Sequence, residues 1–352
     1  MHSTLEPPVT TDKTSHISLG LSAAVLVIAG LYFARSFFAP VVFSLFIMAL
    51  VWPFQKFLQA KMPRPLARTI VILATLGVAI SFASTLAWGG HKAGEWLLNN
   101  VSRFQSVYLQ ATHWLEDRGI LQEGLVPERF DVTWIAWFVK EVAGSVNTLV
   151  GFFVLVFLLT MIGLLEVENY QKAIESMEDV ATGRLVLRAA EEMAAKFRKY
   201  MLVRTLASIL TGTLIWGFAL FTNLEMAASW GIIAFALNHL PFIGPLVATI
   251  LPALFAIVQF GSWKMALFIF ISFSVVQFAI GNYIEPLISG AMLDMSPYMV
   301  VFAVFFWTFM WGIPGTFIGV PLTIAFLTIC DQDSSTRWLA VLLSGRAKLR
   351  SN

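Results

Sequence analysis

Long apolar stretches separated by polar segments make up most of the chain, and they predict membrane-spanning helices. A helix needs about 20 apolar residues to cross a bilayer. Single spans are expected at residues 19–33, 37–51, 69–88, 147–165, 202–223 and 265–283. Two further apolar blocks, 226–260 and 297–329, are too long for one ordinary crossing.

Two longer polar segments interrupt this series. Residues 90–146 mix aromatic side chains with charges, which predicts amphipathic helices at the outer membrane surface. Residues 166–200 look helical throughout, because apolar positions recur at helical spacing. The positions are Val186, Ala190, Met193 and Phe197. We expect a helical arm that packs on the bundle or on a neighbouring subunit.

The fold class that follows is all-α. We expect a polytopic membrane protein with about eight membrane segments, two of them broken helices or re-entrant hairpins. The expected parts are a cytoplasmic tail (1–18), three spans (19–88), an external amphipathic segment (89–146), a fourth span (147–165), a cytoplasmic arm (166–200), a C-terminal core (201–330) and a cytoplasmic tail (331–352).

Composition agrees with a lipid environment. The chain is 58% hydrophobic and 12% charged, whereas an ordinary soluble domain is about 25% charged. This excludes a soluble globular protein and a disordered chain. The net charge of +2 gives no reason to expect a nucleic-acid partner. A single cysteine excludes a disulfide framework and a multi-cysteine metal site.

The distribution of basic residues predicts the orientation, because short loops rich in Lys and Arg stay in the cytoplasm. The segment between the second and third spans holds Lys56, Lys61, Arg64 and Arg68 and no acidic residue. It should be cytoplasmic, which places the N-terminus inside as well. The tail after Asp331 is also predominantly basic. Both termini are therefore expected in the cytoplasm.

Clusters of Pro and Gly interrupt the two long apolar blocks. The first contains Asn238, His239, Pro241, Gly244 and Pro245, and the second contains Gly312, Pro314 and Gly315. Each cluster should end one helix and start another. Each block could be one kinked crossing or a re-entrant hairpin, and half-segments of about 12–17 residues favour the hairpin.

Broken helices in a membrane survive only within protein or beside a watery cavity, and paired ones indicate the substrate site of a transporter. Asn282, Glu285 and Pro286 lie between the two blocks. Glu285 is a candidate functional acid within apolar sequence, or an interfacial acid that caps a helix or pairs with a base. His239 could bind substrate, or it could satisfy backbone carbonyls freed by Pro241.

Three stretches carry a resemblance to a known family: FALNHLPFIGPLVATILPALFAI (235–257), GNYIEPLISGAMLDMSP (281–297) and FFWTFMWGIPGTFIGVPLTIAFL (305–327). They resemble the autoinducer-2 exporter family of bacterial membrane proteins, and the likeness extends from about residue 15 to residue 330. One departure is that Ala291 follows Gly290, where family members often carry a basic residue.

The resemblance implies a multi-pass secondary transporter of the bacterial inner membrane that assembles as a homo-oligomer. It would export a small polar molecule such as autoinducer-2 by alternating access around the two broken helices. The resemblance also places the core of the transport site at the first breaker, completed by an Asn282–Glu285–Pro286 turn and the second breaker. A sodium/proton (monovalent cation) antiporter is the alternative, and an oligomeric passive channel is a further one.

Enzymatic functions are not expected. The sequence has no H-E-x-x-H motif, and His239 is the only histidine in the C-terminal core. It also has no G-x-x-x-x-G-K-[ST] phosphate loop, so transport would draw on an ion gradient or on the gradient of the substrate. We expect no cofactor and no metal site. The expected partners are the lipid bilayer, a small polar substrate or monovalent cation, and further copies of the chain.

Overall fold

The computed structural model describes residues 13–119, 133–289, 295–332 and 336–344. These residues are organised in helices and contain no strand. The elements are α1 (Lys13–Phe33), α2 (Arg35–Gln59), α3 (Arg64–Asn99), α4 (Val101–Asp117), α5 (Thr133–Glu175), α6 (Val180–Phe221), α7 (Ala227–Leu237), α8 (Ile243–Phe260), α9 (Trp263–Ala279), the π-helix η1 (Ile280–Ile284), α10 (Glu285–Ser289), α11 (Pro297–Trp311), α12 (Ile313–Gln332) and α13 (Arg337–Ser344).

Seven helical segments in the described residues are long and apolar enough to cross a membrane. They are α2, α3, Val150–Glu175 of α5, α6, α8, Trp263–Ile288 and α12. Three shorter apolar helices accompany them, at Ser18–Phe33, α7 and α11. Many large apolar side chains on these helices are exposed in the isolated chain, as lipid-facing side chains would be. The prediction of an all-α polytopic membrane protein is confirmed.

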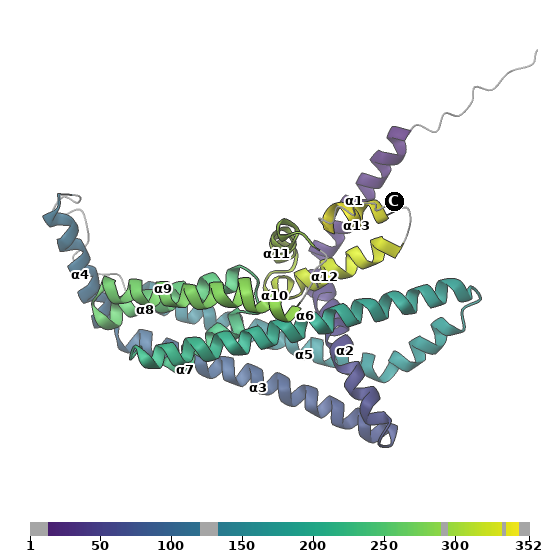
Figure 1. The fold of residues 1–352 in the computed structure, drawn as a ribbon, viewed down its shortest axis with the longest axis horizontal. Helices are drawn as coiled ribbons and strands as arrows, with labels where there is room; N and C mark the ends of the chain where they lie inside the picture. The colour runs from purple at the N-terminus through teal and green to yellow at the C-terminus, as the bar shows by residue number, and fades with distance from the viewer. Residues whose placement is uncertain (1–12, 120–132, 290–294, 333–335, 345–352) are drawn as a thin grey trace, which may run out of the picture.

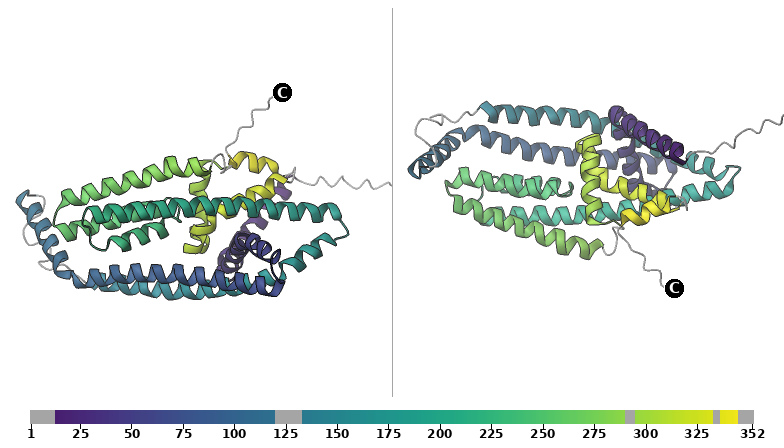
Figure 2. Two further views of the ribbon diagram at one scale, coloured as in Figure 1. Left: turned by 60° about the horizontal axis from the view of Figure 1, so that its bottom comes forward. Right: turned by 90° about the horizontal axis from the view of Figure 1, so that it is seen from above.

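Helices α3, α5, α6, α8 and α9 lie side by side along the long axis of the molecule, whereas α2 and α11 run across it (Figures 1 and 2). Helix α7 packs between α6 and α3, and α8 packs between α7 and α9. The largest buried cluster joins α6, α7, α8 and α9 through residues that include Ile215, Trp230, Phe255 and Phe273. The C-terminal core thus holds most of the tightly packed interior.

The two ends of the bundle differ in the segments that they bring together. At one end, the Arg68 and Gln59 side chains bind the Glu168 carboxylate at 3.2 and 3.0 Å, which joins the basic α2–α3 turn to the base of the arm. At the other end, the Glu225 carboxylate accepts hydrogen bonds from the Trp96 indole and Arg103. Segments predicted to be cytoplasmic therefore share one end, and those predicted to be external share the other.

The arm is not a separate unit, because α5 and α6 each run without a break from the bundle into it (Figure 1). Neither helix contains a proline, and the 42 residues of α6 extend roughly 63 Å. Phe197 of the predicted apolar face is buried and its ring lies 4.5 Å from that of Phe46, whereas Val186 further along the arm is exposed. Packing of that outer part on a neighbouring subunit stays a prediction.

Asp179 caps the start of α6 at the turn of the arm. Its carboxylate accepts hydrogen bonds from the backbone N–H groups of Ala181 and Thr182 at 3.0 and 3.2 Å. The Thr182 hydroxyl also donates to it, and these hydrogen bonds lower the pKa of Asp179 below its ordinary value. The stabilisation that the Asp179 cap gives to the folded state is therefore complete above the ordinary pKa of an aspartate. It is lost as the pH falls through the lowered pKa of Asp179.

Replacing Asp179 with alanine should leave the first N–H groups of α6 without their acceptor and loosen this turn of the arm. We expect hydrogen exchange at Ala181 and Thr182 to accelerate severalfold relative to the wild type, measured by mass spectrometry near neutral pH. Asp179→Asn, which keeps an acceptor oxygen, is the control and should exchange more slowly than Asp179→Ala. Equal exchange rates in the wild type and Asp179→Ala would show that the cap is unimportant.

Candidate functional site

The first Pro/Gly cluster forms the tip of an antiparallel hairpin of α7 and α8. Residues on either side of the tip pair in opposite order: Gly244 lies against Leu237, and the Trp230 ring is 5.1 Å from the Phe255 ring. A Cβ at position 244 would overlap the Leu237 carbonyl oxygen. Glycine at this position therefore lets the two helices approach closely.

The tip itself contains a strained turn. Phe242 has φ of 62° and ψ of −53°, and the N–H of Ile243 donates to the Pro241 carbonyl at 2.7 Å. This is a γ-turn with positive φ at its central residue, a conformation that costs about 1–3 kcal/mol in a non-glycine residue. Pro241 is buried, whereas Phe242 is exposed. Pro245 lies in the first turn of α8, where its missing N–H is tolerated.

The second Pro/Gly cluster forms the tip of the hairpin of α11 and α12. Gly312 ends α11 with φ of 66° and ψ of −141°, a conformation that is in practice open only to glycine. Gly315 lies against the backbone of Trp307, and Gly319 lies against Ala303, so the helices are antiparallel. The Trp307 indole donates to Thr323 at 3.1 Å. Pro314 occupies the first turn of α12, as proline prefers.

Each long apolar block thus folds back on itself, which favours the hairpin over the kinked crossing. The halves are unequal: α7 and α11 have 11 and 15 residues, and α8 and α12 have 18 and 20. The expectation of two short halves was wrong for α8 and α12, which both have the length of a membrane span. Entry and exit of each hairpin on one side of the bilayer stays a prediction.

The segment between the hairpins is helical instead of forming the predicted turn at 282–286. The chain passes from α9 through the π-helix η1 into α10, and the N–H of Glu285 donates to the Ile280 carbonyl five residues earlier. The wide π-turn accommodates Pro286, which has no N–H to continue the α-helical ladder. It also changes the face of the helix on which Glu285 lies.

Glu285 forms an ion pair with Arg204 of α6. The Arg204 Nη1 and Glu285 Oε1 atoms are 2.7 Å apart, and the two side chains are only 11% and 22% exposed. The structure shows that Glu285 pairs with a base, while its assignment as a functional or an interfacial acid stays a prediction. Arg204 was not among the candidate residues, although an arginine within the apolar run of α6 was a visible signal.

The tip of the first hairpin lies against the same part of α6. Asn238 is 2% exposed, and its side-chain N–H donates to the Ser208 hydroxyl at 3.2 Å. His239 Nδ1 donates to the Phe235 carbonyl at 3.0 Å, and its ring lies 6.5 Å from Phe317 of α12. The two hairpins therefore approach each other at His239 and Phe317.

Only some of the predicted site residues contribute polar groups to this region. Glu285 binds Arg204, Asn238 binds Ser208 one turn further along α6, and His239 follows Asn238 at the tip of the first hairpin. Asn282 is exposed and donates to the Phe278 carbonyl of its own helix, and Pro286 is also exposed. The remaining predicted residues shape the two hairpins: Pro241, Gly244, Pro245, Gly312, Pro314 and Gly315. Gly290 and Ala291, where the sequence departs from the family pattern, lie outside the described residues.

Two donors beside the ion pair have no partner. The Tyr200 hydroxyl and the Arg204 Nε are buried and make no hydrogen bond. Tyr200 precedes Arg204 by four residues on α6, so the two side chains lie on the same face of the helix. In the part of the chain that the structure describes, no cluster of three or more His, Cys, Asp or Glu residues could hold a metal ion. The Tyr200 hydroxyl and the Arg204 Nε can therefore donate hydrogen bonds in the region of the Arg204–Glu285 ion pair.

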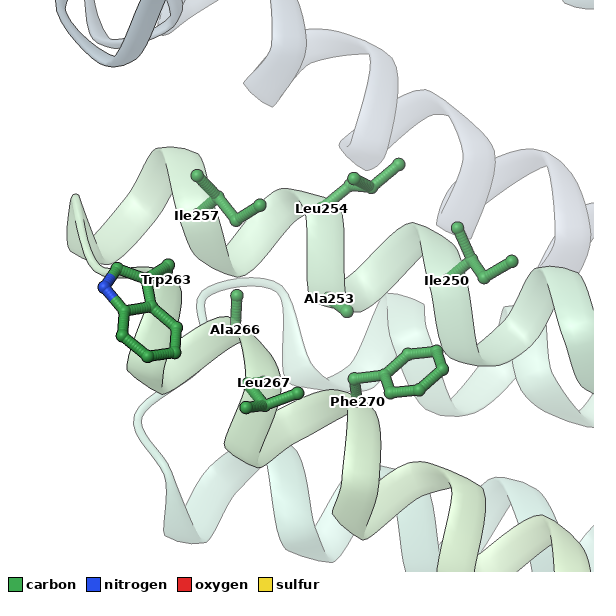
Figure 3. A pocket seen from close by; sticks show the side chains of 8 residues that line it. All are labelled: Ile250, Ala253, Leu254, Ile257, Trp263, Ala266, Leu267 and Phe270. Atoms are coloured by element: carbon green, nitrogen blue, oxygen red, sulfur yellow. The ribbon is translucent and has the colours of Figure 1, made fainter. Parts of the chain in front are cut away.

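A separate groove of about 370 Å³ lies between α8 and α9 (Figure 3). Its walls are apolar side chains, namely Ile250, Ala253, Leu254, Ile257, Trp263, Ala266, Leu267 and Phe270. It offers almost no polar group that could orient a polar solute. The polar region around Arg204 is therefore the better candidate site.

Comparison with known proteins agrees with this architecture. The profile of the AI-2E family transporter matches residues 21–333. The AI-2 transport protein TqsA of Escherichia coli (strain K12) is 27% identical over 96% of this chain and 98% of the relative. YhhT of the same organism is 25% identical over 96% of this chain and 97% of its own length. YrrI of Bacillus subtilis (strain 168) is 23% identical over 82% of this chain and 84% of the relative.

Proposed function

Because the chain belongs to the AI-2E family of transporters, we propose that it is a secondary transporter of a small polar molecule such as autoinducer-2. It would export this molecule across the bacterial cytoplasmic membrane by alternating access around the α7–α8 and α11–α12 hairpins. The name of TqsA supports this choice of substrate class. Both termini would lie in the cytoplasm, as the basic α2–α3 turn indicates.

The observation that carries the proposal is the Arg204–Glu285 ion pair, which joins α6 to the helical segment between the two hairpins. A charged pair within membrane-spanning helices is expensive, and such groups generally lie on a transport path. Here the pair joins α6 to the helix that connects the hairpins. Movement of either hairpin relative to α6 would change the access of solute to this pair.

The same contacts argue against a cation as the transported species. Backbone carbonyls freed at a helix break could bind a cation, but several near the first tip already accept hydrogen bonds. The carbonyls of Ala234, Ala236, Leu237 and Leu240 all accept hydrogen bonds from nearby backbone N–H groups. A polar solute that carries acceptor oxygens fits the buried Tyr200 hydroxyl and Arg204 Nε better.

Flux measurements with the purified chain in proteoliposomes would test the proposal. We expect saturable flux of autoinducer-2 and no flux of sodium ions above empty vesicles. Glu285→Gln should reduce autoinducer-2 flux at least tenfold, because the ion pair that holds Arg204 is lost. Glu225→Gln, at the exposed pair with Arg103, is the matched control and should retain flux.

Three results would contradict the proposal. Flux that rises linearly with concentration would indicate a channel, and sodium flux without autoinducer-2 flux would favour the cation antiporter. Equal autoinducer-2 flux in the wild type and Glu285→Gln would remove the ion pair from the transport site.

A further inference from the structure

We infer that the Tyr200 hydroxyl and the Arg204 Nε donate hydrogen bonds to acceptor oxygens of the transported molecule. The inference rests on the proposed transport function and adds to it the residues that recognise the substrate. Neither residue was among the candidates that the sequence suggested. Tyr200 and Arg204 lie four residues apart on α6 and therefore share one face of the helix.

The first argument is that these two donors are buried without a partner. Tyr200 is 8% exposed, and neither its hydroxyl nor the Arg204 Nε makes a hydrogen bond. A buried donor without an acceptor costs about 1–3 kcal/mol, and native proteins contain few of them. The side chains of the apolar neighbours Val304 and Val320 offer no acceptor. A molecule that enters the site would supply one.

The second argument is that the guanidinium group is held with one side free. Glu285 binds Nη1 at 2.7 Å, which restricts the position of the group, while Nε makes no hydrogen bond. Glu285 is therefore a positioning residue for Arg204. A pre-oriented guanidinium loses little freedom when it binds a further oxygen.

The third argument is the way in which the donors are covered. Tyr200 forms a buried cluster with Val304 and Val320 of the second hairpin, and Ile243 at the tip of the first hairpin packs against this cluster. Asn238 of the first hairpin binds Ser208, one turn further along α6 from Arg204. Displacement of either hairpin from α6 would uncover both donors, as alternating access requires.

The chemistry of the donors defines the class of substrate. A phenolic hydroxyl and a guanidinium N–H both suit hydroxyl, carbonyl or carboxylate oxygens of a small solute. A site that donates to a substrate oxygen discriminates strongly against an analogue without that oxygen, because its donors then stay unpaired. A monovalent cation has no acceptor atom for these two hydrogen-bond donors.

The test compares Tyr200→Phe with the wild type in proteoliposomes, with autoinducer-2 as the probe. The substitution removes only the hydroxyl, and we expect the KM to rise about tenfold with an unchanged maximal rate. That factor corresponds to about 1.4 kcal/mol, the loss of one hydrogen bond. Tyr283→Phe, at a tyrosine that is 66% exposed, is the matched control and should leave the KM unchanged. Arg204→Lys keeps a charge for Glu285 but loses Nε, and should also raise the KM.

Thermal unfolding separates recognition from folding. Without solute, Tyr200→Phe should unfold at the wild-type temperature or above, because the lost hydroxyl had no partner. Addition of autoinducer-2 should raise the unfolding temperature of the wild type more than that of Tyr200→Phe. Competition by ribitol would assign the accepting oxygens to hydroxyl groups, and competition by acetate, which has no hydroxyl group, would assign them to a carboxylate.

The failures of the two proposals are distinguishable. Wild-type flux with the same KM in Tyr200→Phe would overturn the recognition role and leave the transport function intact. Absence of both flux and a thermal shift with the wild type would overturn the transport proposal, and the recognition role with it.

Discussion

Replacement of Arg204 alone by methionine should destabilise the protein by about 3–5 kcal/mol, because the Glu285 carboxylate is then left buried without a partner. The side chain of Glu285 is 22% exposed, so water can compensate only a small part of the loss. The loss is measurable as a lower unfolding free energy in detergent micelles. Transport should be abolished, since Arg204 also supplies a donor to the proposed substrate.

Removing both charges separates stability from function. The double variant Arg204→Met/Glu285→Met should regain most of the lost stability, because an apolar pair often replaces a buried ion pair without cost. It should still fail to transport. Arg103→Met, at the exposed pair with Glu225, is the control and should cost about 1 kcal/mol or less. A cost for Arg204→Met no greater than for Arg103→Met would show that the Arg204–Glu285 pair has no structural importance.

Replacement of Gly315 by alanine should destabilise the α11–α12 hairpin by about 3 kcal/mol or more, at the upper end of overpacking effects. A Cβ there would overlap the backbone carbonyl of Trp307, and a backbone atom cannot move aside as a flexible side chain can. The helices would have to separate, which would also disturb the adjacent Thr308–Thr316 hydrogen bond. Thermal unfolding and flux measurements on the same preparation report both effects.

Gly217→Ala is the matched control for this prediction. Gly217 also lies within a helix, but a Cβ there would meet no atom within 4 Å. The substitution should therefore leave stability unchanged or raise it by up to about 1 kcal/mol, because alanine favours the helix. If Gly315→Ala behaves like Gly217→Ala, the close approach of α11 and α12 is not required for folding.

Much of the fold could be predicted because it depends on local chemistry. Apolar length identifies helices for lipid, and Pro and Gly end a helix wherever they occur, since both act through their own backbone. The breaks at residues 238–245 and at Gly312 were therefore visible in the sequence. The unequal halves of the hairpins were not, because Pro245 and Pro314 lie in the first turns of the helices that follow and do not shorten them.

The site was predicted only in part. Asn238, His239 and Glu285 were found because a polar group in an apolar stretch is conspicuous, while Asn282, found in the same way, proved to bind its own helix. Arg204 and Tyr200 were missed because their role depends on a helix 81 positions away in the chain. The π-helix before Glu285 was missed as well, since a Gly-Asn-x-x-Glu-Pro run equally suggests a turn.

The order of apolar and polar residues was thus sufficient to predict the lipid environment, the all-α class and the positions where helices break. Each of these depends on neighbours within a few turns. The partner of Glu285, the orientation of the two hairpins against α6 and the two unpaired donors were decided by packing. An acid in lipid requires a partner, but the folded chain alone selects which base lies within 2.7 Å of it. The tertiary structure thereby converts a set of isolated polar residues into one candidate transport site.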